Sequence, residues 1–217
     1  IFFEGKFVNK DINKSIYYFK LAANQNFVDA KFYLGSVYFY IYSFDSNQIN
    51  LNNSINYFKE ASTCNDCFSK INLAAIYLRN NNVDYAKGLL EEAIFLKNEK
   101  VALFNLATVY FFVENKFDES LPLLMKSAMC GFSPSENLLG IMIVYKFGRN
   151  YNIHDIFLKN GIDNFELEQK IFNVIKSNNL EDYYSYQQFY LFNSNKYYIY
   201  DFYHNPQEIS RVKQNKI

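Results

Sequence analysis

Few residues in this sequence have the types and spacing that chemistry requires. Cys64 and Cys67 form a lone Cys-x2-Cys pair, and the third cysteine, Cys130, lies far along the chain. A redox pair of this kind is typical of a βαβ setting, and a structural zinc ion needs four ligands. The residues around this pair supply neither, so we interpret the three cysteines as structural or incidental and predict no metal site.

The two histidines, His154 and His204, have no neighbouring acid or cysteine pattern such as His-Glu-x2-His. We interpret both as surface or structural residues. The sequence also lacks a glycine-rich phosphate loop, a dinucleotide-binding fingerprint and the Gly-x-Ser-x-Gly nucleophile motif. We therefore predict no catalytic residues, no cofactor and no enzymatic activity.

Composition excludes further classes of function. The 217 residues include 22 basic and 22 acidic ones and no basic block, whereas nucleic-acid binding needs clustered Lys and Arg. The longest nearly apolar run covers residues 138–145, far short of the roughly 20 residues of a membrane span. We predict a cytoplasmic location. Because the chain begins with Ile1 rather than Met, we also expect it to be a fragment whose first helix starts upstream.

Two helical patterns recur along residues 1–148. The first joins a small residue to Leu, a second small residue and mostly Tyr, in the series Ala30/Leu34/Gly35/Tyr38, Ser69/Leu73/Ala74/Tyr77, Ala102/Leu106/Ala107/Tyr110 and Ser135/Leu139/Gly140/Ile143. The second joins Ser15, Ser54, Ala86 or Ser120 to an apolar pair three and four residues later, Tyr18/Phe19, Tyr57/Phe58, Leu89/Leu90 or Leu123/Leu124. Successive copies lie 32 to 39 residues apart. Such a period, with two helices per unit, predicts an all-α solenoid of antiparallel helix pairs.

The small residues let two helix backbones approach, and the large residues on the same face fill the space between them. We predict helix starts at Asn13, Asn52, Asp84 and Asp118, and helix ends at Asn26, Asn65, Asn98 and Gly131. The second unit has about six extra residues between positions 40 and 51, which we expect to lengthen a surface loop. Residues 149–217 are predicted to hold a degenerate repeat, a capping helix near 165–175 and a Tyr-rich tail.

The segment DINKSIYYFKLAANQNFVDAKFYLGSVY, residues 11–38, resembles a Sel1-like repeat, and Ala102–Ala128 resembles the related tetratricopeptide repeat. The resemblance covers roughly residues 1–148. It implies a right-handed superhelix with a C-terminal helical cap, and a scaffold or adaptor that binds a protein or peptide segment in a concave groove. An alternative is a regulatory fragment of a longer protein with a kinase or other catalytic domain upstream.

The resemblance also implies that the first helix of each unit lines the groove. The predicted partner-binding residues are Tyr33, Ser36, Tyr40, Asn72, Arg79, Asn105, Thr108 and Phe112. In related repeats an Asn at the position of Asn72 and Asn105 bonds the backbone of the ligand; here the amides could equally be polar because they face water. The aromatic lining favours an apolar segment, which could be the chain's own tail. The sequence does not predict an oligomeric state.

Overall fold

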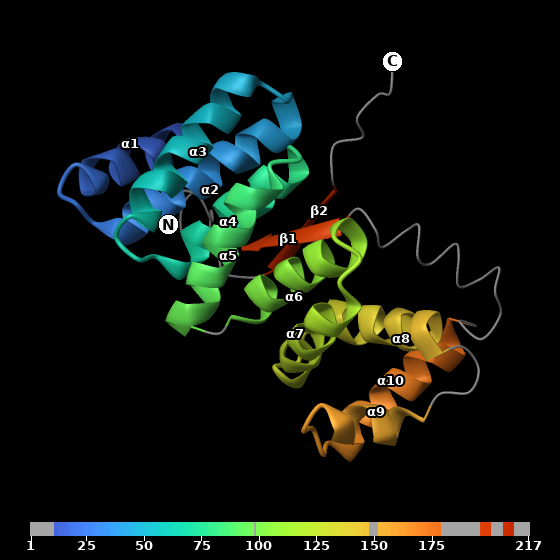
Figure 1. Ribbon diagram of the computed structural model, residues 1–217. Helices are drawn as coiled ribbons and strands as arrows, with labels where there is room; N and C mark the ends of the chain where they lie inside the picture. Colours follow the sequence, from blue (N-terminus) through green and yellow to red (C-terminus); the bar gives the residue numbers. More distant parts are fainter. Residues whose placement is uncertain (1–10, 98, 148–151, 179–195, 201–205, 211–217) are drawn as a thin grey trace. The chain divides into compact units, whose positions relative to one another are not determined.

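The structure is a computed structural model that describes residues 11–97, 99–147, 152–178, 196–200 and 206–210. Over these residues it contains ten α-helices, one π-helical segment and two paired strands (Figure 1). The elements are α1 (Ile12–Ala23), α2 (Val28–Asp45), α3 (Gln48–Ser62), α4 (Cys67–Arg79), α5 (Val83–Lys97), α6 (Lys100–Thr108), η1 (Val109–Val113), α7 (Phe117–Met129), α8 (Ser133–Phe147), α9 (Ile153–Lys159), α10 (Phe165–Ser177), β1 (Lys196–Tyr200) and β2 (Pro206–Ser210).

The chain divides into two compact units. The first unit comprises Ile1–Lys97 with Tyr198–Gln207, and the second comprises Asn98–Tyr197 with Glu208–Ile217. The boundary that we predicted at residue 148 stays a prediction; α8 and α10, which lie on either side of it, pack directly against each other. Helices α1 to α5 lie in the first unit, and α6 to α10 lie in the second.

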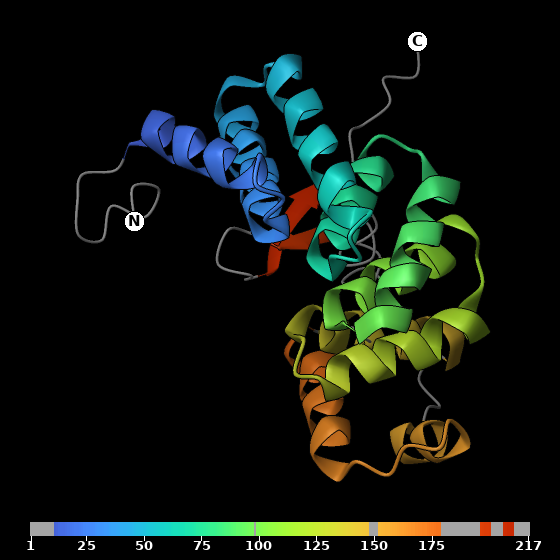
Figure 2. The same cartoon turned by 90° about the vertical axis from the view of Figure 1, so that its left-hand side faces the viewer.

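Each unit is built from helices that pack against their neighbours in the chain. In the first unit α2 packs against α3 and α4 against α5, while α1 lies on α2 and α3 lies on α4 (Figure 2). In the second unit α6 packs against α7, α7 against α8, and α10 covers α8. The predicted all-α solenoid of helix pairs and its C-terminal helical cap are confirmed.

A small residue opposite a large one determines how closely α2 and α3 approach. A Cβ atom added at Gly35 would lie 2.6 Å from the ring of Phe58, which is itself only 1% exposed. The Ser54 hydroxyl donates a hydrogen bond of 2.8 Å to the Gly35 carbonyl. In the α6–α7 pair, Ser120 donates a bond of the same length to the carbonyl of Ala107. The repeated small residues therefore serve the close helix contacts that their pattern predicts.

The predicted helix starts are wrong by a few residues. Helix α1 is capped by Asp11, whose side chain accepts a hydrogen bond from the Lys14 N–H, and α3 is capped by Asn47. The four predicted caps lie inside helices instead, at Asn13, Asn52, Asp84 and Asp118. The repeat pattern marks where two helices touch, and α1 and α3 continue past that contact to a residue that caps them, whereas α7 begins after Lys116 without a side-chain cap.

The predicted helix ends are more accurate. Asn26, Asn65 and Gly131 adopt the left-handed conformation, with φ of 65°, 61° and 72°. That conformation lets the chain leave a helix while its last carbonyls stay bonded. Asn98 lies outside the described residues. Left-handed asparagines also occur at Asn81 and Asn115, in the turns that follow α4 and η1, which the prediction did not include.

The extra residues between positions 40 and 51 do not form the expected loop. They lengthen both helices, so that α2 runs to Asp45 and α3 begins at Gln48. Only Ser46, which is left-handed with φ of 52°, and Asn47 connect the two helices. The Asp45 carboxylate accepts hydrogen bonds from the Asn47 N–H and the Asn50 side chain, which stabilises this short turn.

Helix α10 matches the capping helix predicted near residues 165–175 within about two residues. Helix α9 starts at Ile153, Gly161 ends the segment after it with φ of 71°, and α10 covers the predicted capping helix. We predicted no strand in residues 149–217, but the structure pairs β1 with β2. The Tyr-rich segment at 180–192 lies outside the described residues. None of the described helices combines the length and hydropathy that crossing a bilayer requires.

Candidate functional site

Three of the predicted partner-binding residues lie on α2. Tyr33 and Tyr40 are half-buried, while Ser36 is buried. The Tyr33 ring lies 5.3 Å from that of Phe19, and Tyr40 meets Phe44 edge to face at 4.8 Å. The Ser36 hydroxyl has no hydrogen-bond partner among the described residues. This helix face therefore presents two aromatic rings held by neighbouring rings, with a polar atom between them.

Two further predicted residues lie on α4, in the same unit. Arg79 is partly exposed, and its guanidinium group lies 5.3 Å from the centre of the Tyr42 ring on α2. This contact places the C-terminal part of α4 beside the C-terminal part of α2. Asn72 is 0% exposed. Its side chain is enclosed in this structure, and the hydrogen bond expected between Asn72 and a partner stays a prediction.

The remaining three predicted residues lie in the second unit. Asn105 and Thr108, on α6, are buried at 0% and 1% exposure, and the Thr108 hydroxyl donates to the Asn105 carbonyl at 2.7 Å. Phe112 belongs to η1 and is half-buried, with its ring 4.8 Å from that of Phe111. The structure thus groups the eight predicted residues as five on α2 and α4 and three on α6 and η1.

The π-helical segment η1 is a feature that the sequence did not predict. It extends α6 by five residues, and the Glu114 N–H donates to the carbonyl of Val109, five residues earlier, at 3.1 Å. Such segments are rare and often occur at functional sites. The sequence of Val109–Val113 is apolar and fits an α-helix as well as a π-helix, so no sequence signal distinguishes the two.

His154 has a specific partner. Its Nδ1 lies 3.1 Å from Oε1 of Glu168, which joins α9 to α10, and the Glu168 side chain is only 8% exposed. The hydrogen bond and the charge of Glu168, with smaller contributions from Asp163 and Asp155, raise the pKa of His154 above its usual 6.5. The pair borders a cavity of about 480 Å³. Neither residue belongs to a motif, so only the fold reveals that they meet.

Cys64 and Cys130 are exposed, Cys67 is buried with its Sγ 3.6 Å from the Ala93 carbonyl, and none of the three forms a disulfide. Across the described ranges, no group of three or more His, Cys, Asp and Glu side chains is arranged to hold a metal ion.

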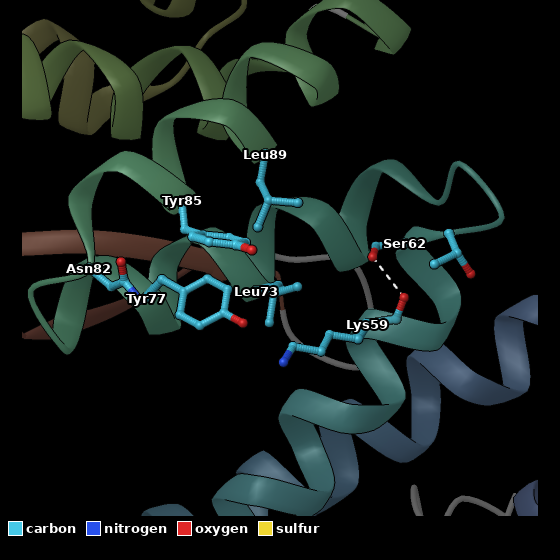
Figure 3. Close-up of a pocket in the computed structure, with 8 residues that line it drawn as sticks. Lys59, Ser62, Leu73, Tyr77, Asn82, Tyr85 and Leu89 are labelled. Carbon is cyan, nitrogen blue, oxygen red and sulfur yellow. Dashed lines mark hydrogen bonds between the residues drawn. The ribbon is translucent and has the colours of Figure 1, made fainter.

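A second candidate site is a cavity of about 410 Å³ in the first unit (Figure 3). Helices α3, α4 and α5 all contribute to it. Its lining combines apolar side chains with hydroxyls, an amide and one ammonium group, from Lys59, Ser62, Thr63, Leu73, Tyr77, Asn82, Tyr85 and Leu89. Sequence reasoning missed this site because residues from three helices form it and no motif connects them.

Comparisons with known proteins agree with this architecture. The family model of the Sel1 repeat matches residues 1–27 and 28–66. A protective antigen of uropathogenic Escherichia coli strains, c5321, which displays an SLR fold, aligns with a TM-score of 0.61 at 21% identity over 89% of this chain. This chain spans 42% of the length of that antigen.

A Sel1 repeat protein from Oxalobacter formigenes aligns with a TM-score of 0.61 at 16% identity, over 88% of this chain and 82% of its own. A search among curated proteins found no match. The matched residues identify repeats in the first third of the sequence, and the structural likeness extends the same fold over most of the rest. Residues 1–66 therefore match the Sel1 repeat, and the chain has the fold of Sel1-repeat proteins.

Proposed function

We propose that this chain is a non-catalytic interaction scaffold that binds a segment of a partner protein on the face formed by α2 and α4. Proteins with Sel1 repeats generally mediate protein–protein interactions. The observation that carries the proposal is the grouping of Tyr33, Tyr40 and Arg79 on these two neighbouring helices, each of them partly exposed. Tyr and Arg are, together with Trp, the residue types most enriched among energetically important interface residues.

The chemistry of this face suits an apolar or aromatic segment. The rings of Tyr33 and Tyr40 offer apolar area at low entropic cost, because a tyrosine has only two side-chain torsions to restrict. Arg79 already stacks on Tyr42, so its guanidinium is held in place for a carboxylate or a second ring. On α2, the Ser36 hydroxyl lies between Tyr33 and Tyr40 in the sequence and could accept a hydrogen bond if binding opened a path to it.

The enclosed amides of Asn72 and Asn105 have a supporting role in this proposal. A buried amide rigidifies the helix that carries it when its polar atoms are bonded. The proposal therefore does not require either amide to reach the partner. The predicted cytoplasmic location, the predicted lack of nucleic-acid binding and the alternative of a catalytic domain elsewhere in a longer polypeptide stay predictions that this proposal does not need.

Site-specific photo-crosslinking tests the proposal. A benzophenone amino acid is placed at Tyr40, on the proposed face, or at Phe95, which lies on α5 and is 91% exposed. We expect a discrete partner band from the Tyr40 position, and we expect the band to weaken when Arg79→Ala is added to that protein. Capture of the same partner from Phe95 but not from Tyr40 would refute the assignment of this face.

A further inference from the structure

We infer that the cavity bordered by α3, α4 and α5 is a binding site for a molecule or side group that combines one carboxylate with an apolar body. The site is independent of the proposed partner face. Helix α4 turns by about 100° per residue, so Leu73 and Tyr77 point to a different side of the helix from Asn72 and Arg79. The volume of about 410 Å³ lies within the range of small-ligand pockets.

The apolar part of the ligand is indicated by the apolar side chains that line the cavity. Leu73, which is 3% exposed, and Leu89 contribute two aliphatic side chains. The rings of Tyr77 and Tyr85 lie 5.8 Å apart at an angle of 56°, forming an aromatic corner. In Figure 3 the two tyrosine rings and the leucines border the same space. A hydrocarbon group of modest size fits such a lining.

The polar part is indicated by the balance of donors and acceptors. The Ser62 hydroxyl already donates to the Lys59 carbonyl at 2.8 Å, and Thr63 donates to the Glu60 carbonyl at 2.7 Å. By contrast, the Lys59 ammonium and the hydroxyls of Tyr77 and Tyr85 make no hydrogen bond or ion pair with other described residues. A tyrosine hydroxyl can donate or accept, so the Lys59 ammonium, which can only donate, is the group that requires an acceptor on the ligand.

Charge selects the carboxylate among possible acceptors. Among the described residues that line the cavity, Lys59 alone carries a formal charge. The helix ends do not decide the sign, because the last turn of α3 and the first turn of α5 both border the cavity and their partial charges are opposite. In the view of Figure 3 the Lys59 ammonium and the hydroxyl of Tyr77 approach the space beside Leu73. A cation is disfavoured there, although aromatic rings alone would accept one.

The carboxylate could belong to a free small acid or to the C-terminus of a peptide, and the experiment separates these sources. Ligand-observed NMR titrations of the full chain use 4-phenylbutyrate, and acetyl-Gly-Gly-Phe with a free carboxylate. The uncharged amide of each compound is the control. We expect saturable binding of at least one acid and roughly tenfold weaker binding of its amide, the typical size of a charge-assisted hydrogen bond. Preference for the phenylbutyrate or for the peptide identifies the source.

Variants connect the binding to this cavity. Lys59→Met keeps most of the aliphatic stem but removes the charge, and it should weaken binding of the acid about tenfold without affecting the amide. Lys59→Arg should retain binding. Lys14→Met is the matched control, because Lys14 is exposed on α1 and pairs with Asp11 outside the cavity. Equal binding of acid and amide, unchanged binding by Lys59→Met, or no saturable binding of either acid would overturn the inference.

Discussion

The α2–α3 and α4–α5 pairs occupy successive repeats of the first unit, but residues of different size form the contact between the two helices of each pair. In α2–α3 the contact position is Gly35, and the ring of Phe58 covers it so closely that no Cβ fits. In α4–α5 the equivalent positions are Ala74 and Leu90, both fully buried. A smaller residue on one helix thus accompanies a larger one on the other, and we infer that the two positions must change together.

The hydroxyl that connects the helices varies independently of this size match. Ser54 bonds the Gly35 carbonyl, whereas the equivalent residue of α5 is Ala86, which has no hydroxyl to donate. In the second unit, α6–α7 combines the alanine and leucine of one pair, as Ala107 and Leu124, with the hydroxyl of the other, as Ser120. Side-chain size is therefore matched between the two helices of each pair, whereas the hydrogen bond between them is present in some pairs and absent from others.

The largest expected effect comes from removing the large residue of each pair. Phe58→Ala should lower the free energy of unfolding of the first unit by about 4 kcal/mol, and Leu90→Ala by about 3 kcal/mol. The phenylalanine change should cost more because Gly35 has no side chain with which to fill the void. Urea unfolding followed by circular dichroism measures both. A larger loss from Leu90→Ala than from Phe58→Ala would contradict the inferred match between a small residue on one helix and a large one on the other.

Adding a methyl group at the glycine tests the size match directly. Gly35→Ala should destabilise by about 1–3 kcal/mol, because the new Cβ would lie within 3 Å of three atoms of the Phe58 ring. Adding Phe58→Leu should recover much of this loss, since the double variant has the composition of α4–α5. Gly88→Ala on α5 is the matched control.

A Cβ at Gly88 would meet nothing within 4 Å. That change should therefore stabilise by up to about 1 kcal/mol, through the better helix propensity of alanine. The unfolding free energies of the unchanged protein, Gly35→Ala, Phe58→Leu and the double variant give the coupling between positions 35 and 58. Strictly additive effects of Gly35→Ala and Phe58→Leu would mean that the two positions are not matched to each other.

The cross-helix hydroxyl should matter less than the shape. Ser54→Ala removes one buried hydrogen bond and leaves the Gly35 carbonyl with its helical partner, so we expect a loss of about 1 kcal/mol. Ser120→Ala should behave in the same way in the second unit. Thermal melts suffice for both measurements. Losses as large as that of Phe58→Ala would show that the hydrogen bond, rather than the shape, holds the pairs together.

The smallest effect is expected at the contact between His154 of α9 and Glu168 of α10, which depends on charge rather than on close packing. Partnership with Glu168 raises the folded-state pKa of His154, so the contribution of this pair is fully present below about pH 6.5 and is lost as the pH rises through the higher folded value. Amide hydrogen exchange in α9 should therefore be slower at pH 6 than at pH 8, after correction for intrinsic rates. His154→Gln should abolish that difference; a pH dependence that persists in this variant would assign it to other groups.

The repeat pattern predicted much of this fold because close helix contacts leave a regular trace in the sequence. Small residues such as Gly35 and large ones such as Phe58 recur at a nearly constant spacing. The apolar face of α10 is likewise visible in the sequence, from the helical period of its apolar residues. The extra residues between 40 and 51 were harder to interpret. Their polar end suggested a loop, but capping by Asn47 and the left-handed Ser46 allow both helices to continue almost to the turn.

The candidate sites were less predictable than the fold. The positions of Tyr33 and Arg79 follow from the helical period, but the enclosure of Asn72 depends on all the elements that surround α4, which no local pattern records. The cavity beside Lys59 and the His154–Glu168 pair share this difficulty. Each depends on residues that approach only after helices have packed, and none of these residues has a spacing that sets it apart.

The close approach at Gly35 also gives this molecule a built-in spectroscopic label. Where other residues carry a Cβ, Gly35 carries a hydrogen that points at the Phe58 ring. The ring current of an aromatic side chain displaces the resonance of a proton held in that position. A displaced α-proton signal would thus report that α2 and α3 are docked, and its return to an ordinary chemical shift would follow the separation of this single helix pair during unfolding.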